Sequence, residues 1–294
     1  MNGVIVIDKE AGFTSFDVVA KVRKLCRPHK VGHTGTLDPD ATGVLPVCIG
    51  NATRAADIMS GNDKKSYRTV MRLGSATDTY DSSGVVTERG DASGITDDEL
   101  EDAVKLFTGE IMQIPPMYSA IKIGGKKLYE LAREGKEIER EARKITIHSL
   151  SIVCRSGNDI TLDIDCSKGT YIRSLCHDIG LKLGCFAHMA HLQRTKSGNF
   201  TINDAVKLSA LADITDIEKY LIPTERLFDY PDFTVSEKQE YLVKNGVNAY
   251  CEGKIGKYRV FNKKGEFLSV SEITEIEGKK CLKLVKSFYG ATKG

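Results

Sequence analysis

The chain has 294 residues, of which 41% are hydrophobic and 28% charged, and its formal net charge is +2. These values exclude an intrinsically disordered chain and a histone-like polycation, and the length suits one large domain with one small domain. No apolar run reaches the roughly 20 residues that cross a bilayer. The N-terminus also lacks the features of a signal peptide, so we expect a cytoplasmic protein with no membrane partner.

The chain contains eight cysteines, but none are spaced as Cys-x-x-Cys and no paired histidine spacing accompanies them. Zinc sites and disulfide frameworks show such spacings, so neither is predicted. We expect reduced thiols in the core and no bound metal.

Periodicity predicts a mixed α/β domain over about residues 1–230. Residues 3–7 are typical of a buried strand, and a capping box at Thr14 begins a helix over about 15–26. A strand follows over 44–50, in which a proline, Pro46, indicates a sheet edge or an irregularity. The apolar stripe expected on the first helix is Phe16, Val19, Val22 and Cys26. The other predicted elements are strands at 67–73, 145–153 and 159–167 and helices at about 97–107, 170–183, 203–211 and 215–221.

Residues 114–144 interrupt this pattern. Between Ser119 and Lys144 the chain has eight Lys or Arg residues against five Glu, with prolines before them and a glycine pair near the middle. This composition predicts a basic, partly helical excursion from the core. A solvated charged helix is the alternative, because Glu and Arg alternate along the segment.

Residues 231–294 carry 12 Lys or Arg against 8 Asp or Glu, a net charge of +4. Short strands are expected at 257–262, 266–273 and 280–286, separated by turns that contain Gly and Lys. A small basic β-domain is the natural interpretation.

The segment 30–50, KVGHTGTLDPDATGVLPVCIG, clusters glycines, prolines and aspartates before an apolar run. Its glycines allow a shaped loop that could present the carboxylate of Asp38, but an aspartate before a proline is also a common turn signal. Asp40 raises the same question and is given no catalytic role. No phosphate-binding glycine motif occurs in the chain, which argues against nucleoside triphosphate and dinucleotide chemistry.

Three more residues have both a functional and a structural interpretation. His33 could be a general base or a hydrogen-bonded loop residue. Arg173 could pair with a carboxylate through two hydrogen bonds or be a solvated helix residue. Tyr67 could stack on a nucleobase or pack in the core. Spacing alone does not decide among these alternatives.

The segment GHTGTLDPDATGVLPVCIG resembles the signature of the TruB-type pseudouridine synthases, which modify uridine 55 of bacterial tRNA. Five further blocks resemble the same family in the same order: VIVIDKEAGFTSFDVV, KSYRTVMRLGSATDTYD, PPMYSAIKIGGKKLYELAREG, GTYIRSLCHDIG and HLQRTKSG. The resemblance covers most of residues 3–200. It implies a catalytic domain with a largely antiparallel central sheet over 1–230 and a small PUA-like RNA-binding barrel over 231–294.

The resemblance also implies roles for individual residues. Asp38 matches the essential aspartate, Tyr67 the tyrosine that stacks on the target base, and Arg173 the arginine that holds the aspartate. The residues expected to contact substrate or RNA are Lys9, His33, Lys65, Tyr171, Leu192 and Arg194.

Three positions depart from the family pattern. Glu10 stands where proline is usual, Phe186 where a small residue is common, and Gln193 where arginine is frequent. None of them matches one of the three catalytic positions, so the departures concern local packing and one phosphate contact.

The implied reaction isomerises a uridine in the T-arm of tRNA after the base is flipped out, and it requires no cofactor. The excursion at 114–144 is then expected to act as a clamp on the RNA, and a monomer with no obligate protein partner is expected. Two alternatives stay open: a guide-RNA-dependent synthase of the dyskerin type, and a non-catalytic protein that binds or folds tRNA.

Overall fold

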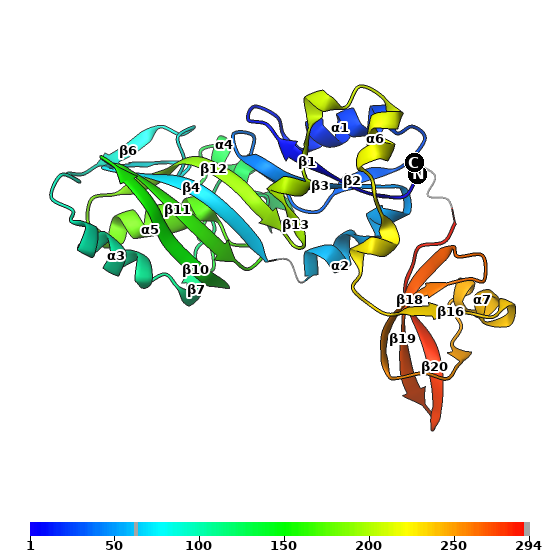
Figure 1. Cartoon of the computed structure of the whole chain (residues 1–294). Coiled ribbons are helices and arrows are strands. Elements are labelled where there is room, and N and C mark those ends of the chain that lie inside the picture. Colours follow the sequence, from blue (N-terminus) through cyan, green and yellow to red (C-terminus); the bar gives the residue numbers. More distant parts are fainter. Residues whose placement is uncertain (62–63, 291–294) are drawn as a thin grey trace.

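The computed structural model describes residues 1–61 and 64–290, and its main feature is a long mixed sheet (Figure 1). Within the described residues this sheet has eleven strands, and its principal path runs β14-β1-β3-β12-β4-β11-β10-β7. Most neighbouring strands are antiparallel, as predicted. The strands on this path are β1 (Gly3–Lys9), β3 (Thr42–Ile49), β4 (Lys65–Leu73), β7 (Gly109–Gln113), β10 (Arg143–Ser156), β11 (Asp159–Cys166), β12 (Ala187–Ser197) and β14 (Val206–Lys207). Three short strands flank it: β2 (Val31–His33), β13 (Phe200–Thr201) and β15 (Ile222–Pro223).

Strand β12 joins the two halves of this sheet. On one side it runs parallel to β3, with Gln193 opposite Thr42 and Arg194 opposite Gly43. On the other side it runs antiparallel to β4 along almost its whole length. The ends of β3, β4 and β12 that meet here surround the loop between β2 and β3.

Helices and short turns cover the sheet. The α-helices of this part are α1 (Ser15–Leu25), α2 (Ala56–Gly61), α3 (Asp97–Lys105), α5 (Ile172–Lys182) and α6 (Ile214–Tyr220). Capping boxes at Thr14 and Thr96 begin α1 and α3, which confirms both predicted helix starts. Helix α5 packs against β12, and its residues Ile172, Leu175 and Ile179 enter the main core. A separate two-stranded sheet is formed by β5 (Ser75–Thr77) and β6 (Val86–Arg89).

The structure corrects two sequence predictions. The helix predicted over 203–211 is instead two 3-10 turns, η2 (Ile202–Asp204) and η3 (Leu208–Ala210), separated by β14. β14 forms because Val206 lies opposite Ile7 of β1, a partner almost 200 residues away. Phe16, expected on the inner face of α1, is 67% exposed.

The sequence predicts that Pro46 marks either a sheet edge or an irregularity. Strand β3 lies inside the sheet, between β1 and β12, so Pro46 marks an irregularity. Strand β12 pairs with β3 only at Thr42 and Gly43, and β2 pairs with it only from Val47 onward. Pro46 lies between these two stretches, where its carbonyl oxygen accepts from the Thr34 N–H at 3.2 Å. Pro46 has no N–H to donate back to Thr34, and the ladder with β2 ends at His33.

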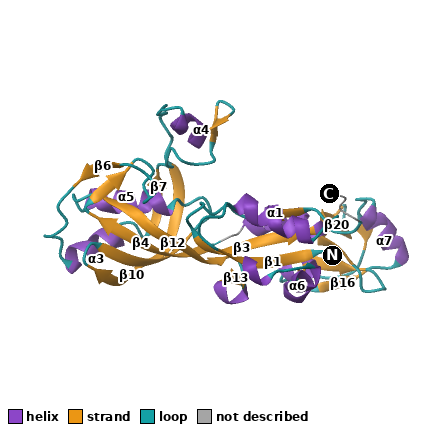
Figure 2. Ribbon diagram, turned by 90° about the horizontal axis from the view of Figure 1, so that it is seen from above, coloured by secondary structure: helices purple, strands orange, loops and turns teal. Residues whose placement is uncertain are grey.

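The basic excursion projects from the end of β7 and returns at β10 (Figure 2). It contains the hairpin strands β8 (Lys122–Ile123) and β9 (Lys126–Lys127) and helix α4 (Leu128–Arg133). A small cluster of its own, centred on Met117, Leu128 and Leu131, holds it together. The segment is therefore an ordered projection rather than a single charged helix.

The C-terminal residues form a second, five-stranded sheet with the order β16-β18-β19-β20-β17, a half-barrel with one helix. Phe228 and Phe288 join it to the rest of the molecule, packing with Ala55 and Val270. Its elements are β16 (Asp232–Thr234), α7 (Glu237–Lys244), β17 (Ala249–Tyr250), β18 (Gly256–Phe261), β19 (Phe267–Ile276) and β20 (Lys279–Ser287). A last 3-10 turn, η4 (Thr224–Leu227), precedes this sheet, and η1 (Gly50–Ala55) follows β3.

Within the described residues, no helix is long and apolar enough to cross a membrane. All eight cysteines are free thiols. Six are buried, as expected of core residues, whereas Cys154 is exposed and Cys251 is partly exposed.

Candidate active site

The loop between β2 and β3 carries Asp38, and hydrogen bonds from other segments fix its shape. The Ser15 hydroxyl donates to the Leu37 carbonyl oxygen at 3.1 Å and accepts from the Leu37 N–H at 2.9 Å. The Lys9 ammonium donates to the Pro39 carbonyl oxygen at 2.8 Å. Asp38 therefore lies between two residues whose backbones are held by β1 and α1.

Arg194 of β12 holds the same loop from the other side. Its guanidinium, fully buried, donates to the carbonyl oxygens of Val44 at 2.7 Å, Gly35 at 3.1 Å and Thr36 at 3.4 Å. β3 and β12 approach closely here, because a Cβ on Gly43, whose φ is 97°, would lie 2.2 Å from the Arg194 carbonyl oxygen. A larger residue at Gly43 would push β3 away from β12.

The guanidinium of Arg173, in the first turn of α5, joins Asp38 to Asp81. Its Nε lies 3.1 Å from Asp38 Oδ2, and its Nη1 lies 3.4 Å from Asp81 Oδ2. The two terminal nitrogens also donate to the carbonyl oxygens of Thr79 at 3.3 Å and Tyr118 at 2.9 Å. The Arg173 side chain is 7% exposed and that of Asp38 is 42% exposed, so a buried cation supports a carboxylate that a substrate can reach.

Opposing effects set the protonation of Asp38. Burial raises the pKa of the Asp38 carboxyl, because desolvation disfavours the charged form, and the Arg173 guanidinium opposes this rise. The charges of Asp81 and Asp40 raise the same pKa further, whereas Lys9 lowers it. The balance leaves the pKa above that of an ordinary aspartate, so Asp38 loses its charge at a higher pH than usual.

Asp81 is a site residue that the sequence analysis did not assign. Its Oδ1 accepts from the Thr79 hydroxyl at 2.7 Å and from the Ser83 N–H at 3.0 Å, and its backbone forms a bridge with Met189 of β12. An aspartate among threonines and serines is typical of a turn in which side chains bond the backbone. That signal indicates a shaped loop, but it does not reveal the arginine opposite.

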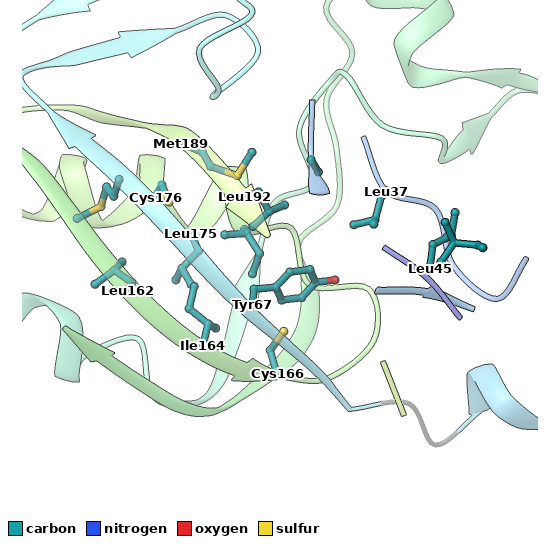
Figure 3. Packing of buried hydrophobic residues seen from close by; sticks show 14 of the residues in the cluster. Leu37, Leu45, Tyr67, Leu162, Ile164, Cys166, Leu175, Cys176, Met189 and Leu192 are labelled. Carbon is teal, nitrogen blue, oxygen red and sulfur yellow. The ribbon is translucent and has the colours of Figure 1, made fainter. Parts of the chain in front are cut away.

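Tyr67 of β4 and Leu192 of β12 form the apolar side of the site (Figure 3). Both are less than 10% exposed, and they share a core cluster with Leu37. Burial raises the pKa of the Tyr67 phenol to about 12, opposed by the Arg194 guanidinium. The phenol is therefore neutral near pH 7.

His33 and Lys65 lie at the same loop, and Tyr171 lies at the start of the helix that carries Arg173. The His33 Nδ1 accepts from the Gly35 N–H at 3.2 Å. Burial lowers the pKa of His33, with the charges of Arg194 and Lys65 adding to the effect, so its imidazole is neutral near pH 7. Lys65 opens β4 with its ammonium close to Gly35, and Tyr171 immediately precedes α5.

Two residues expected to contact RNA have a different place in the structure. The side chains of Lys9 and Arg194 are both fully buried, and their donors are bound to backbone carbonyl oxygens. Burial lowers the pKa of Lys9 to about 8, opposed by the charges of Asp40 and Asp38. The geometry thus assigns Lys9 and Arg194 to shaping the loop, because neither is accessible to a phosphate.

The three departures from the family pattern lie outside the contacts of Asp38. Glu10 supplies only its carbonyl oxygen to Lys9, at 3.0 Å. Phe186 adopts a φ of 60° in the turn after α5, and Gln193 is paired within the sheet. In the described part of the chain, no group of three or more His, Cys, Asp or Glu residues could hold a metal ion.

The chain matches two family profiles in succession. Residues 23–172 match "TruB family pseudouridylate synthase (N terminal domain)", and residues 173–229 match "tRNA pseudouridylate synthase B C-terminal domain". A relative from Clostridium perfringens (strain 13 / Type A), named tRNA pseudouridine synthase B, is 49% identical over 94% of this chain and 96% of its own length. A relative of the same name from Clostridium tetani is 45% identical over 97% of this chain and 100% of its own length.

Solved structures resemble the fold as well. One described as "Crystal Structure of a Cbf5-Nop10-Gar1 Complex" matches with a TM-score of 0.71 and 28% identity, over 98% of this chain and 85% of that chain. The archaeal box H/ACA sRNP Nop10-Cbf5 complex matches with a TM-score of 0.69 and 26% identity, over 98% of this chain and 86% of that chain. Together with the successive profile matches and the close relatives, these likenesses show that the chain belongs to the TruB family of pseudouridylate synthases.

Proposed function

We propose that this chain isomerises uridine 55 in the T-loop of tRNA to pseudouridine, with residues 1–230 as the catalytic domain. The contact between Asp38 and the buried Arg173, next to Tyr67, carries the proposal. The names of the relatives support tRNA as the substrate.

The reaction moves one glycosidic bond. The bond between N1 of uracil and C1′ of the ribose breaks, the base turns, and C5 bonds to C1′. C5 loses its proton and N1 gains one, so no atom is added and no electron is exchanged with a cofactor.

A carboxylate suits this reaction as a nucleophile toward the sugar or the base, or as the base that removes a sugar proton. Each of these roles needs the charged form of Asp38. Arg173 supports that form, because a nearby cation opposes the rise of the Asp38 pKa caused by burial. Tyr67 offers a neutral ring on which the uracil can stack while it is detached from the sugar.

The target base must leave its stack to reach Asp38, which costs a few kcal/mol. Contacts with phosphates and with the stem-loop shape offset this cost. We assign these contacts to the projecting segment at 114–144 and to a PUA-like RNA-binding domain at 231–294. His33, Lys65, Tyr171 and Leu192 remain the candidates for contacts near the flipped base.

The dyskerin-type alternative is the weaker one for this chain. The solved Cbf5 structures are described as complexes with Nop10, in one case also with Gar1. They share only 28% and 26% identity with this chain, against 49% for the tRNA synthase relative. We propose a monomer that acts in the cytoplasm without a guide RNA or protein partner. The purified chain alone would then modify a T-arm hairpin and would sediment as a single protomer.

The test uses a synthetic T-arm hairpin labelled with tritium at C5 of the target uridine, incubated with the purified chain, with and without a chelator. Product formation releases the label, because C5 exchanges its proton for a bond to C1′. We expect release by the wild type in both conditions and none by Asp38→Asn, with hairpin binding retained. Undiminished release by Asp38→Asn would contradict the assigned role.

Asp40→Asn is the matched control, because it removes the same charge two residues away. Asp40 is exposed, and we give it no catalytic role. We therefore expect near-normal release from this variant. A wild-type chain that binds the hairpin without releasing label would favour the non-catalytic alternative.

A further inference from the structure

Gln113, the last residue of β7, is a buried amide that binds both backbone groups of one distant residue. Its Nε2 donates to the Tyr171 carbonyl oxygen at 3.0 Å, and its Oε1 accepts from the Tyr171 N–H at 2.8 Å. Only 2% of Gln113 is exposed. The donor and the acceptor on Tyr171 together fix which way the amide faces.

Tyr171 is the residue from which α5 starts. It occupies the N-cap position, but its side chain makes no capping hydrogen bond. Ile172 and Arg173 follow it as the first two helical residues. The amide of Gln113 therefore holds the backbone two residues before the guanidinium that contacts Asp38.

The chain just after Gln113 adds two more contacts to the same helix start. The Ser174 hydroxyl donates to the Ile114 carbonyl oxygen at 3.0 Å. Arg173 itself donates to the Tyr118 carbonyl oxygen at 2.9 Å. The first turn of α5 is thus tied to residues 113–118, the segment that leads into the basic projection.

We propose that Gln113 is a positioning residue for the isomerisation: through Tyr171 it sets the start of α5 so that Arg173 meets Asp38. The inference rests on the proposed function, since it concerns the rate of that reaction. Removing the amide would leave the Tyr171 N–H without a partner and its carbonyl oxygen with only the helical bond from the Leu175 N–H. The first turn of α5 would shift to satisfy the N–H, and a shift of about 1 Å near reacting groups can cost on the order of 100-fold in rate.

The principal test is Gln113→Leu, which replaces the amide with an apolar side chain of similar size that makes no hydrogen bond. The readouts are the single-turnover rate of tritium release at saturating T-arm hairpin and the dissociation constant of the hairpin. We expect the rate to fall on the order of 10- to 100-fold, with a dissociation constant close to that of the wild type.

The pH profile distinguishes positioning from general destabilisation. The charged groups that face Asp38 are Arg173 from α5, Asp81 from the loop after β5, Lys9 from β1 and Asp40 from its own loop. Of these, Gln113→Leu displaces only Arg173, which holds the Asp38 pKa down. The acidic limb of the rate profile should therefore move to higher pH, as it should in Arg173→Lys.

Asn51→Leu is the matched control. Asn51 is also a buried amide with both ends bonded, to the Phe288 carbonyl oxygen and the Thr224 hydroxyl, but it lies where the two sheets meet. This variant should have a lower melting temperature than the wild type, but the acidic limb of its rate profile should not move. If Gln113→Leu also lowers only the melting temperature, with an unmoved acidic limb and a wild-type saturated rate, the inference is overturned.

A double-mutant cycle supplies an independent test. If Gln113 acts through Arg173, adding Gln113→Leu to Arg173→Ala should lower the rate no further. If each substitution instead lowers the rate by its own factor and the two factors multiply in the double variant, the inference is overturned. Should Gln113→Leu fail to fold, Gln113→Met, which keeps an unbranched side chain of similar length and adds no charge, is measured in its place with the same expectations.

These outcomes are separable from a failure of the proposed function. A wild-type chain that releases no label refutes the proposed function. A wild-type chain that does release label, with Gln113→Leu matching it at every pH, refutes only the positioning role.

Discussion

The sequence does not reveal the burial that raises the pKa of Asp38, whereas the family resemblance does assign Arg173, the arginine that opposes the rise. Because each role proposed for Asp38 requires its charged form, activity should fall as the pH drops through its raised pKa. The sign follows from the titration, since protonation removes the reactive form. We therefore expect an acidic limb above the ordinary aspartate value of about 4 in the single-turnover rate.

Arg173→Lys sharpens this prediction. Lysine keeps the charge but cannot reach Asp38, Asp81 and two carbonyl oxygens at once, as the guanidinium does. We expect a saturated rate lower by on the order of 100-fold and an acidic limb displaced to higher pH. A rate profile that coincides with the wild type would show that the ion pair does not support Asp38.

At the scale of residues, the sequence predicts some members of the site and not others. Resemblance assigns Asp38, Tyr67 and Arg173, and the structure brings them together. The resemblance does not assign Asp81 or Gln113, because the role of each depends on a distant partner. Asp81 contacts Arg173, 92 residues away, and Gln113 contacts Tyr171, 58 residues away. Resemblance assigns Lys9 and Arg194 to RNA, because a motif does not reveal that a basic side chain is buried against carbonyl oxygens.

At the scale of elements, local sequence signals predict those helices whose ends and buried faces depend on neighbouring residues. Capping boxes and periodicity indicate the helices observed as α1, α3 and α5. The prediction over 203–211 is wrong because β1 supplies a strand partner there. Phe16 fits the spacing of the inner stripe of α1, but in the first turn its side chain is 67% exposed.

Two capping boxes that both begin with a threonine offer a paired test. Thr14→Ala and Thr96→Ala each remove the hydroxyl that accepts from the backbone N–H of the third helical residue. Each should cost about 1 kcal/mol in the free energy of unfolding, measured by urea denaturation.

The two variants should differ in activity. Ser15, next to Thr14, holds the Leu37 backbone beside Asp38, whereas α3 starts far from the site. Thr14→Ala should therefore lower the saturated rate of tritium release, and Thr96→Ala should leave it unchanged. Equal rates in the two variants would show that the start of α1 does not shape the loop.

At the scale of the whole molecule, the second sheet presents basic side chains away from the catalytic centre. Lys279 and Lys283 lie on β20 and are exposed. The double variant Lys279→Gln/Lys283→Gln should bind the T-arm within full-length tRNA more weakly. The slope of log affinity against log salt should fall by roughly 1 for each phosphate that a lysine no longer neutralises.

The saturated rate should not change in this variant, because neither lysine contacts the catalytic loop. Lys105→Gln/Lys182→Gln, on α3 and α5, removes the same charge elsewhere and serves as the control. An unchanged affinity and salt slope would mean that β20 does not contact the RNA and that residues 231–294 serve another purpose.

The position of β12 between β3 and β4 has a consequence for the synthesis of the protein. While the ribosome is still translating the first 186 residues, the two portions of the sheet have no strand to connect them. Arg194 can contact Val44 only once the chain has grown by 150 residues beyond it, and a contact across such a span forms slowly. A nascent chain that stalls before this point would display two unpaired strand edges and no competent enzyme, which makes it a natural client for chaperones.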